Sequence, residues 1–275
     1  MGFVMNPSRT RYLLVWLVVG IVFAVLLMEN RSIRVHLGNP RELTGYCLLG
    51  AMVFLALFNL RKRLPMLPLG NAATWLILHT VGGVLMGALF LLHTGNLWPN
   101  GVYERALAVL SYLTVLSGIA GYFIQRIYPR LLTETGIEVI YERIPLRISE
   151  LRQKAEALVL ECCDQTRFDT LGRHYLDSLQ WFFRRPRFTL NHIVGSKHSQ
   201  EWLRHQDEAV RRYLNDDERK YLDDLSQLAR QKDCIDLHYT LQGAMKRWLL
   251  VHIPLTVALM VLSFWHLLVV NVYSL

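Results

Sequence analysis

The sequence lacks the cysteine motifs that hold redox metals. Its four cysteines are Cys47, the adjacent Cys162 and Cys163, and Cys234, with no C-x-x-C and no C-x-x-C-H. The first absence argues against an iron–sulfur or thioredoxin-type site, and the second argues against covalently attached haem. Reduced thiols in packed helices account for all four.

Nucleotide-binding loops are also missing. The glycines of the charged segment from 128 to 247 are isolated, so no G-x-G-x-x-G or phosphate loop is present for a nicotinamide or flavin nucleotide. Its histidines have no zinc-type spacing. Acidic residues interspersed from Glu201 to Asp236 break up any basic face, which excludes nucleic acid as the expected partner despite a formal charge of +8. We predict no catalytic residue in this segment.

Long apolar runs are what the chain does have. A helix needs about 17 to 25 apolar residues to cross a hydrocarbon core about 30 Å thick. Five runs reach about that length: Tyr12 to Met28, Leu43 to Leu60, Ala72 to His93, Ala106 to Ile127, and Trp248 to Val272. The first has no small-x-small cleavage site, so we interpret it as a retained span rather than a signal peptide. The sequence therefore predicts an all-α membrane protein with five transmembrane helices.

Charge predicts how these spans are divided and oriented. Spans one to four fill residues 1–127, a mainly helical segment follows at 128–247, and the fifth span occupies 248–275. Short loops rich in Lys and Arg stay cytoplasmic, and such residues precede span one, join spans two and three, and follow span four: Arg9, Arg11, Arg61, Lys62, Arg63, Arg126 and Arg130. We expect a cell (inner) membrane protein whose N-terminus and helical insertion are cytoplasmic.

Four of the ten histidines lie inside the apolar spans. His79 and His93 in the third span are 14 positions apart, as are His252 and His266 in the fifth. Fourteen helical residues advance about 21 Å and return to within about 40° of the starting direction, so each helix presents both imidazoles on one face. Spans three and five should run in the same direction. His79 then matches His252 in depth, and His93 matches His266.

Polar groups in the hydrocarbon zone cost free energy unless they are paired, which makes these histidines functional candidates. Zinc prefers three or four protein ligands, whereas each depth offers only two imidazoles. Two axial ligands suit a haem, and with both axial positions filled the iron favours electron transfer over oxygen chemistry. The four histidines thus predict two haem b groups, held by His79 with His252 and by His93 with His266 inside a four-helix core.

The quartet H-x13-H and H-x13-H resembles the transmembrane di-haem cytochromes b, including those of quinol-oxidising complexes and of ferric reductases. The resemblance covers the membrane core alone. It implies an electron-transfer subunit of a membrane oxidoreductase complex, working between quinone or a redox partner on one side and a partner protein on the other. Multihaem cytochromes or iron–sulfur proteins would be such partners. Haem propionates would need cationic neighbours, for which Lys246 and Arg247 are candidates.

Other interpretations stay open, both for the glycines and for the function. Gly83 and Gly87 follow His79 on the same side of the helix and could leave room for a macrocycle, or they could form a helix-packing motif. The protein could also be a transporter or signalling scaffold using its histidines as a proton relay, although no span contains a central Asp or Glu. A ferric-reductase core is the third alternative.

Overall fold

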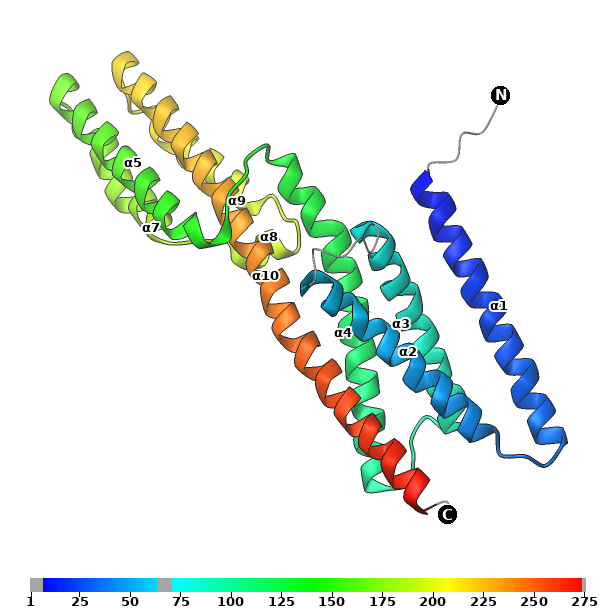
Figure 1. Ribbon diagram of the computed structural model, residues 1–275. Helices are drawn as coiled ribbons and strands as arrows, with labels where there is room; N and C mark the ends of the chain where they lie inside the picture. Colours follow the sequence, from blue (N-terminus) through cyan, green and yellow to red (C-terminus); the bar gives the residue numbers. More distant parts are fainter. Residues whose placement is uncertain (1–6, 64–70, 274–275) are drawn as a thin grey trace, which may run out of the picture. The chain divides into compact units, whose positions relative to one another are not determined.

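The computed structural model describes residues 7–63 and 71–273, and in that part of the chain every regular element is a helix (Figure 1). Five helices are long and apolar enough to span a membrane, which confirms the predicted fold class. These are α1 (Pro7–Val35), α2 (Pro40–Arg63), α3 (Ala72–Thr94), α4 (Val102–Glu134) and α10 (Asp216–Tyr273). The side chains of the predicted cytoplasmic cluster at 61–63 lie outside the described part.

The chain forms two compact units. The first comprises the chain up to Tyr122 together with the segment from Trp248 onward, and the second is Phe123–Arg247. Helix α10 contributes to both, because its charged first half belongs to the second unit and its apolar half, from Trp248, belongs to the first.

The ends of the first histidine-bearing helix are fixed by local chemistry. The Asn71 side chain accepts a hydrogen bond from the Ala73 amide at 3.0 Å, which satisfies one of the unpaired donors at the start of α3. Gly95 ends the helix in the left-handed region at a φ of 65°, and its N–H donates to the Leu91 carbonyl. The two caps fix the residues at which α3 begins and ends.

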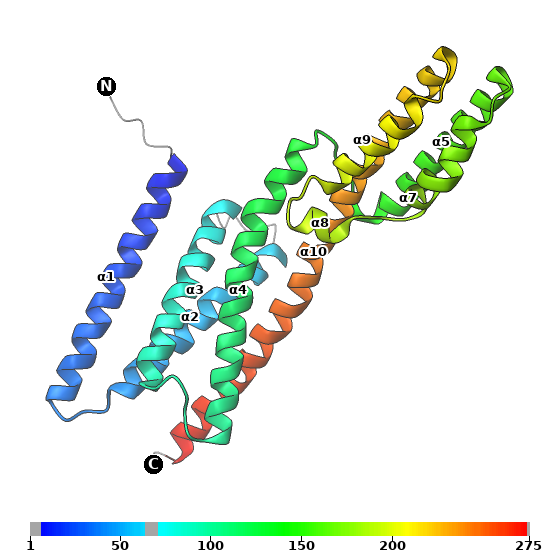
Figure 2. The same cartoon turned by 180° about the vertical axis from the view of Figure 1, so that it is seen from behind.

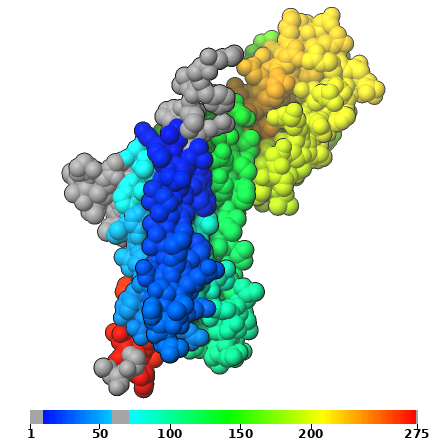
Figure 3. Space-filling model, turned by 90° about the vertical axis from the view of Figure 1, so that its right-hand side faces the viewer, coloured from blue at the N-terminus to red at the C-terminus, as the bar shows by residue number. Residues whose placement is uncertain are grey.

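In the first unit, α2 packs closely against α3, and α1 lies along these two helices (Figures 1, 2 and 3). In the described part of the chain, the backbones of α3 and α10 do not pack closely against each other. Between them lies an apolar core of Met52, Met86 and Leu259, each at most 6% exposed. Met86 and Leu259 are each seven residues from both histidines of their own helix, so this core separates the two histidine depths.

The second unit is a helical bundle around one apolar core. It contains a 3₁₀ turn η1 (Tyr141–Arg143), α5 (Ile144–Thr166), α6 (Thr170–His174), a π-helical turn η2 (Tyr175–Leu179), α7 (Gln180–Arg184), α8 (Thr189–Ile193) and α9 (His198–Arg211). Residues 137–140, just before η1, have no regular secondary structure. The core includes Phe182, Phe183, Leu222 and Leu225, all fully buried.

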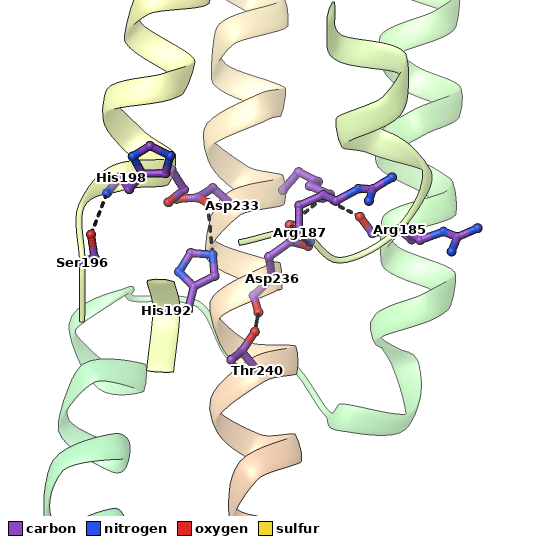
Figure 4. Close-up of polar contacts among 10 residues, drawn as sticks. Arg185, Arg187, His192, Ser196, His198, Asp233, Asp236 and Thr240 are labelled. Carbon is purple, nitrogen blue, oxygen red and sulfur yellow. Dashed lines mark hydrogen bonds and ion pairs between the residues drawn. The ribbon is translucent and has the colours of Figure 1, made fainter. Parts of the chain in front are cut away.

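A charged cluster is buried beside this core (Figure 4). Lys232 and Asp236 have no exposed surface, and Lys232 Nζ donates to Asp236 Oδ2 at 2.5 Å. Asp233, the residue after Lys232, faces His192 at 3.4 Å and accepts a hydrogen bond from the Ser199 hydroxyl at 3.2 Å. Charges removed from water need such partners, and these contacts tie the segment between α7 and α9 to α10.

Candidate functional site

The structure brings the four membrane histidines together in two pairs. The ring centroids of His79 and His252, here called the first pair, are 6.4 Å apart with ring planes at 80°. Those of His93 and His266, the second pair, are 6.5 Å apart at 86°. Each pair joins one ring from α3 to one from α10, in the combination that the order of the spans predicts. Two unrelated pairs thus have almost the same geometry.

These separations are too long for direct contact between two imidazoles. Rings that share a hydrogen bond have centroids about 5 Å apart, since N···N is about 2.9 Å and each nitrogen lies about 1.1 Å from its centroid. Rings on opposite sides of one metal ion have centroids about 6.2 Å apart, since a metal–imidazole bond is about 2.0–2.1 Å long. The centroid separations of both pairs are therefore closer to the value for two imidazoles on one metal ion than to the value for a direct hydrogen bond.

In the first pair, each Nδ1 faces a group of a neighbouring helix. His79 Nδ1 is 3.2 Å from the Leu55 carbonyl oxygen of α2, which can only accept, so Nδ1 carries the proton. His252 Nδ1 is 2.8 Å from the Ser117 hydroxyl of α4. That hydroxyl donates to the Thr114 carbonyl at 2.9 Å and therefore accepts from His252. In both neutral rings the lone pair is then on Nε2, the atom that would bind a metal.

The second pair is supported differently. His93 Nδ1 lies 3.1 Å from the Arg41 carbonyl and 3.2 Å from the Thr44 hydroxyl, both near the start of α2. The His266 ring stacks on Tyr103 of α4, with centroids 6.0 Å apart. The hydroxyl of Ser263, three residues before His266, donates to the Met52 sulfur at 3.9 Å. Three of the four histidines thus have the Nδ1 contact that fixes a ligand tautomer.

The glycines of α3 have different neighbours. A Cβ on Gly83 would meet nothing within 4 Å, and one on Gly87 would meet only Val115, at 3.8 Å. A Cβ on Gly82 would lie 3.0 Å from Leu55, so Gly82 serves the close packing of α3 on α2. Space beside the His79 face of the helix is therefore open at Gly83, whereas Gly87 packs against Val115 of α4.

Small residues on the other helices also lie against the imidazoles. A Cβ on Gly45 of α2 would lie 3.0 Å from His93 Cε1, and one on Gly118 of α4 would lie 3.7 Å from His252 Cε1. These glycines let backbones approach the imidazoles. Their spacing to the histidines in sequence carries no signal, because the contacts are between helices.

The cationic candidates have other surroundings. Lys246 forms an ion pair with Glu142 and lies over the Tyr141 ring at 4.2 Å from its centroid. Arg247 is exposed and is the last residue of the second unit. Contact of either side chain with a haem propionate stays a prediction. Among the described residues, no three His, Cys, Asp or Glu side chains form a cluster that could hold a metal ion.

Comparison of the chain with models of protein families, with curated proteins and with solved structures gives no match. What the fold and site define is a multi-pass α-helical membrane protein that carries two pairs of facing histidines.

Proposed function

We propose that the protein is a membrane-embedded b-type cytochrome with two haem groups, one between His79 and His252 and one between His93 and His266. The observation that carries the proposal is the repeated centroid separation of 6.4 and 6.5 Å. It matches the roughly 6.2 Å expected for two imidazoles on one metal ion.

The donor set favours haem over other metals. Each depth offers two imidazoles, and zinc sites use three or four protein ligands. A haem needs only the two axial positions, since its macrocycle supplies the other four. The open space at Gly83 supports a flat group beside the helix.

The residues would hold the group in a low-dielectric site and fix its ligands. The Leu55 carbonyl and the Ser117 hydroxyl orient His79 and His252 through Nδ1, which raises ligand basicity. A haem held by two imidazoles would supply one-electron transfer. Met52, Met86 and Leu259 would exclude water between the two sites.

The wider setting belongs to the same proposal. Electrons would pass across the cell (inner) membrane between quinone or a redox partner on one side and a partner protein on the other, with the helical unit in the cytoplasm. The protein would be a subunit of an oxidoreductase complex, because its sequence contains no nucleotide-binding loop for an electron donor of its own.

Haem content tests the proposal. The full chain, expressed with ample haem and purified in detergent, should carry two extractable haems per polypeptide with a low-spin b-type spectrum. His79→Ala and His252→Ala should each keep one haem, as should His93→Ala and His266→Ala. His198→Ala, at an exposed position of the second unit, is the control and should keep two.

The alternatives make different predictions. A proton relay or transporter would show no haem absorbance, and that result in well-folded protein rejects the proposal. A complete ferric reductase would oxidise a nicotinamide donor without partners, whereas the proposed subunit should not.

A further inference from the structure

The His252 imidazole is contacted both by α4 and by a residue of its own helix. Trp248, one turn earlier on α10, stacks on its ring with centroids 5.3 Å apart and planes at 20°. Ser117 of α4 faces its Nδ1 at 2.8 Å. Gly121, one turn after Ser117, lies against the Trp248 indole. We call Ser117, Gly121 and Trp248 the Ser117 clamp.

Ser117 engages both rings with separate atoms. Its hydroxyl accepts from His252 Nδ1, since its own proton goes to the Thr114 carbonyl. Its backbone carbonyl accepts from Trp248 Nε1 at 2.7 Å. One residue of α4 therefore fixes the imidazole and the indole stacked on it. Loss of the hydroxyl would remove the first bond and leave the second in place.

Gly121 completes the arrangement by having no side chain. A Cβ at this position would overlap the Trp248 ring, so the indole reaches the Ser117 carbonyl only because residue 121 is glycine. Residues 117 and 121 lie on one side of α4, and 248 and 252 lie on one side of α10. The two helices meet here through complementary pairs.

We propose that Ser117 is a positioning residue for the first-pair haem, acting through His252 and supported by Trp248; this inference rests on the proposed function. A hydrogen bond from Nδ1 increases the donor strength of a ligating imidazole and fixes its orientation, and loss of such a partner typically weakens metal binding about 10–100-fold. A stronger donor stabilises the ferric state. The Ser117 hydroxyl therefore lowers the midpoint potential of this haem relative to a variant without it.

Redox titration of the purified full chain, followed by absorbance and electron paramagnetic resonance, tests this role. The first-pair haem is assigned as the component that His252→Ala removes. Ser117→Ala should shift that component to higher potential and weaken haem retention at that site, without moving the second component. Ser117→Thr, which keeps the hydroxyl, should restore the wild-type potential. Ser111→Ala, the same substitution at another buried position of α4, is the matched control.

A second variant keeps the test decisive if Ser117→Ala is not recovered. Trp248→Phe retains a ring over His252 but removes the donor to the Ser117 carbonyl, so the resonance of the first-pair haem should change and that of the other should not. Unchanged potentials in Ser117→Ala, or an unchanged resonance in Trp248→Phe, would overturn the inference. If the protein still bound two haems, the proposed function would stand. Wild-type protein without haem would reject both.

Discussion

Replacing Lys232 by Met should make the free energy of unfolding of the second unit fall more steeply with rising pH, above pH 6, than it does in the wild type. Lys232 Nζ donates to Asp236 Oδ2 at 2.5 Å and to the Arg185 carbonyl at 2.9 Å, and Asp236 Oδ2 accepts from the Arg187 amide at 3.0 Å (Figure 4). These bonds tie the chain between α7 and α8 to α10. Met retains the length of the side chain and removes the charge beside the buried carboxylate.

The magnitude follows from the pKa of Asp236. Burial raises this pKa from 3.8 to about 6, although the Lys232 ammonium acts in the opposite direction. A carboxyl whose folded-state pKa is raised stabilises the fold below its unfolded pKa, and that stability is lost as pH rises through the folded pKa. In the wild type the loss is roughly 3 kcal/mol and is complete slightly above pH 6.

In Lys232→Met the loss of stability with rising pH should continue above pH 6. Because desolvation is no longer opposed by the ammonium, the pKa of Asp236 rises further, and the carboxyl stays protonated in the folded chain above pH 6. Stability relative to wild type then falls by about 1.4 kcal/mol for each unit by which the pKa of Asp236 rises. Each such unit increases local opening about tenfold. Asp233, His192 and Arg187 face the same cluster in both proteins, so their effects cancel in the comparison.

Hydrogen exchange of residues 185–199, measured by mass spectrometry on the full chain at pH 6, 7 and 8 and corrected for intrinsic exchange, reports this opening. Lys220→Met, at an exposed ion pair with Asp217 on the same helix, should follow the wild type. In the double variant Lys232→Met/Asp236→Asn the extra slope should disappear, because no carboxyl remains to titrate. A wild-type slope in Lys232→Met, or a slope that survives in the double variant, would refute the reasoning.

Two further substitutions have local effects. Gly45→Val should displace His93, because a Cβ at position 45 would lie 3.0 Å from His93 Cε1, and haem content should fall from two to one. Gly50→Val on the same helix should keep two haems, because a Cβ there would meet nothing within 4 Å. Asn215→Ala should cost about 1 kcal/mol, because Asn215 caps α10 through the Glu218 amide at 2.8 Å, and exchange of the first turn of α10 should rise about fivefold.

Features that repeat along one helix could be predicted from the sequence. The apolar runs predict the five spans. Asn215 followed three residues later by Glu218 is a helix-start pattern, and both reciprocal capping bonds are present at the start of α10. The face shared by His79 and His93 also follows from helix geometry alone. Each of these depends only on residues a few turns apart in one element.

Features that depend on a neighbouring helix could not be predicted. Nothing in the sequence around Leu55 indicates that its carbonyl accepts from His79, because the acceptor is a backbone atom. The buried pair of Lys232 and Asp236 has the i, i+4 spacing of an ordinary surface ion pair. Only the packing of the segment containing Arg187 against α10 removes it from water.

The glycines show why composition alone left two interpretations open. Gly82 and Gly83 are adjacent, yet a Cβ on the first would press on Leu55 and a Cβ on the second would meet nothing within 4 Å. Successive helical positions point about 100° apart, so one faces α2 while the other does not. Helix packing and room for a flat group are therefore assigned to different residues of the same motif. This division allows α3 to approach α2 closely while space stays open at Gly83, beside the face that carries His79.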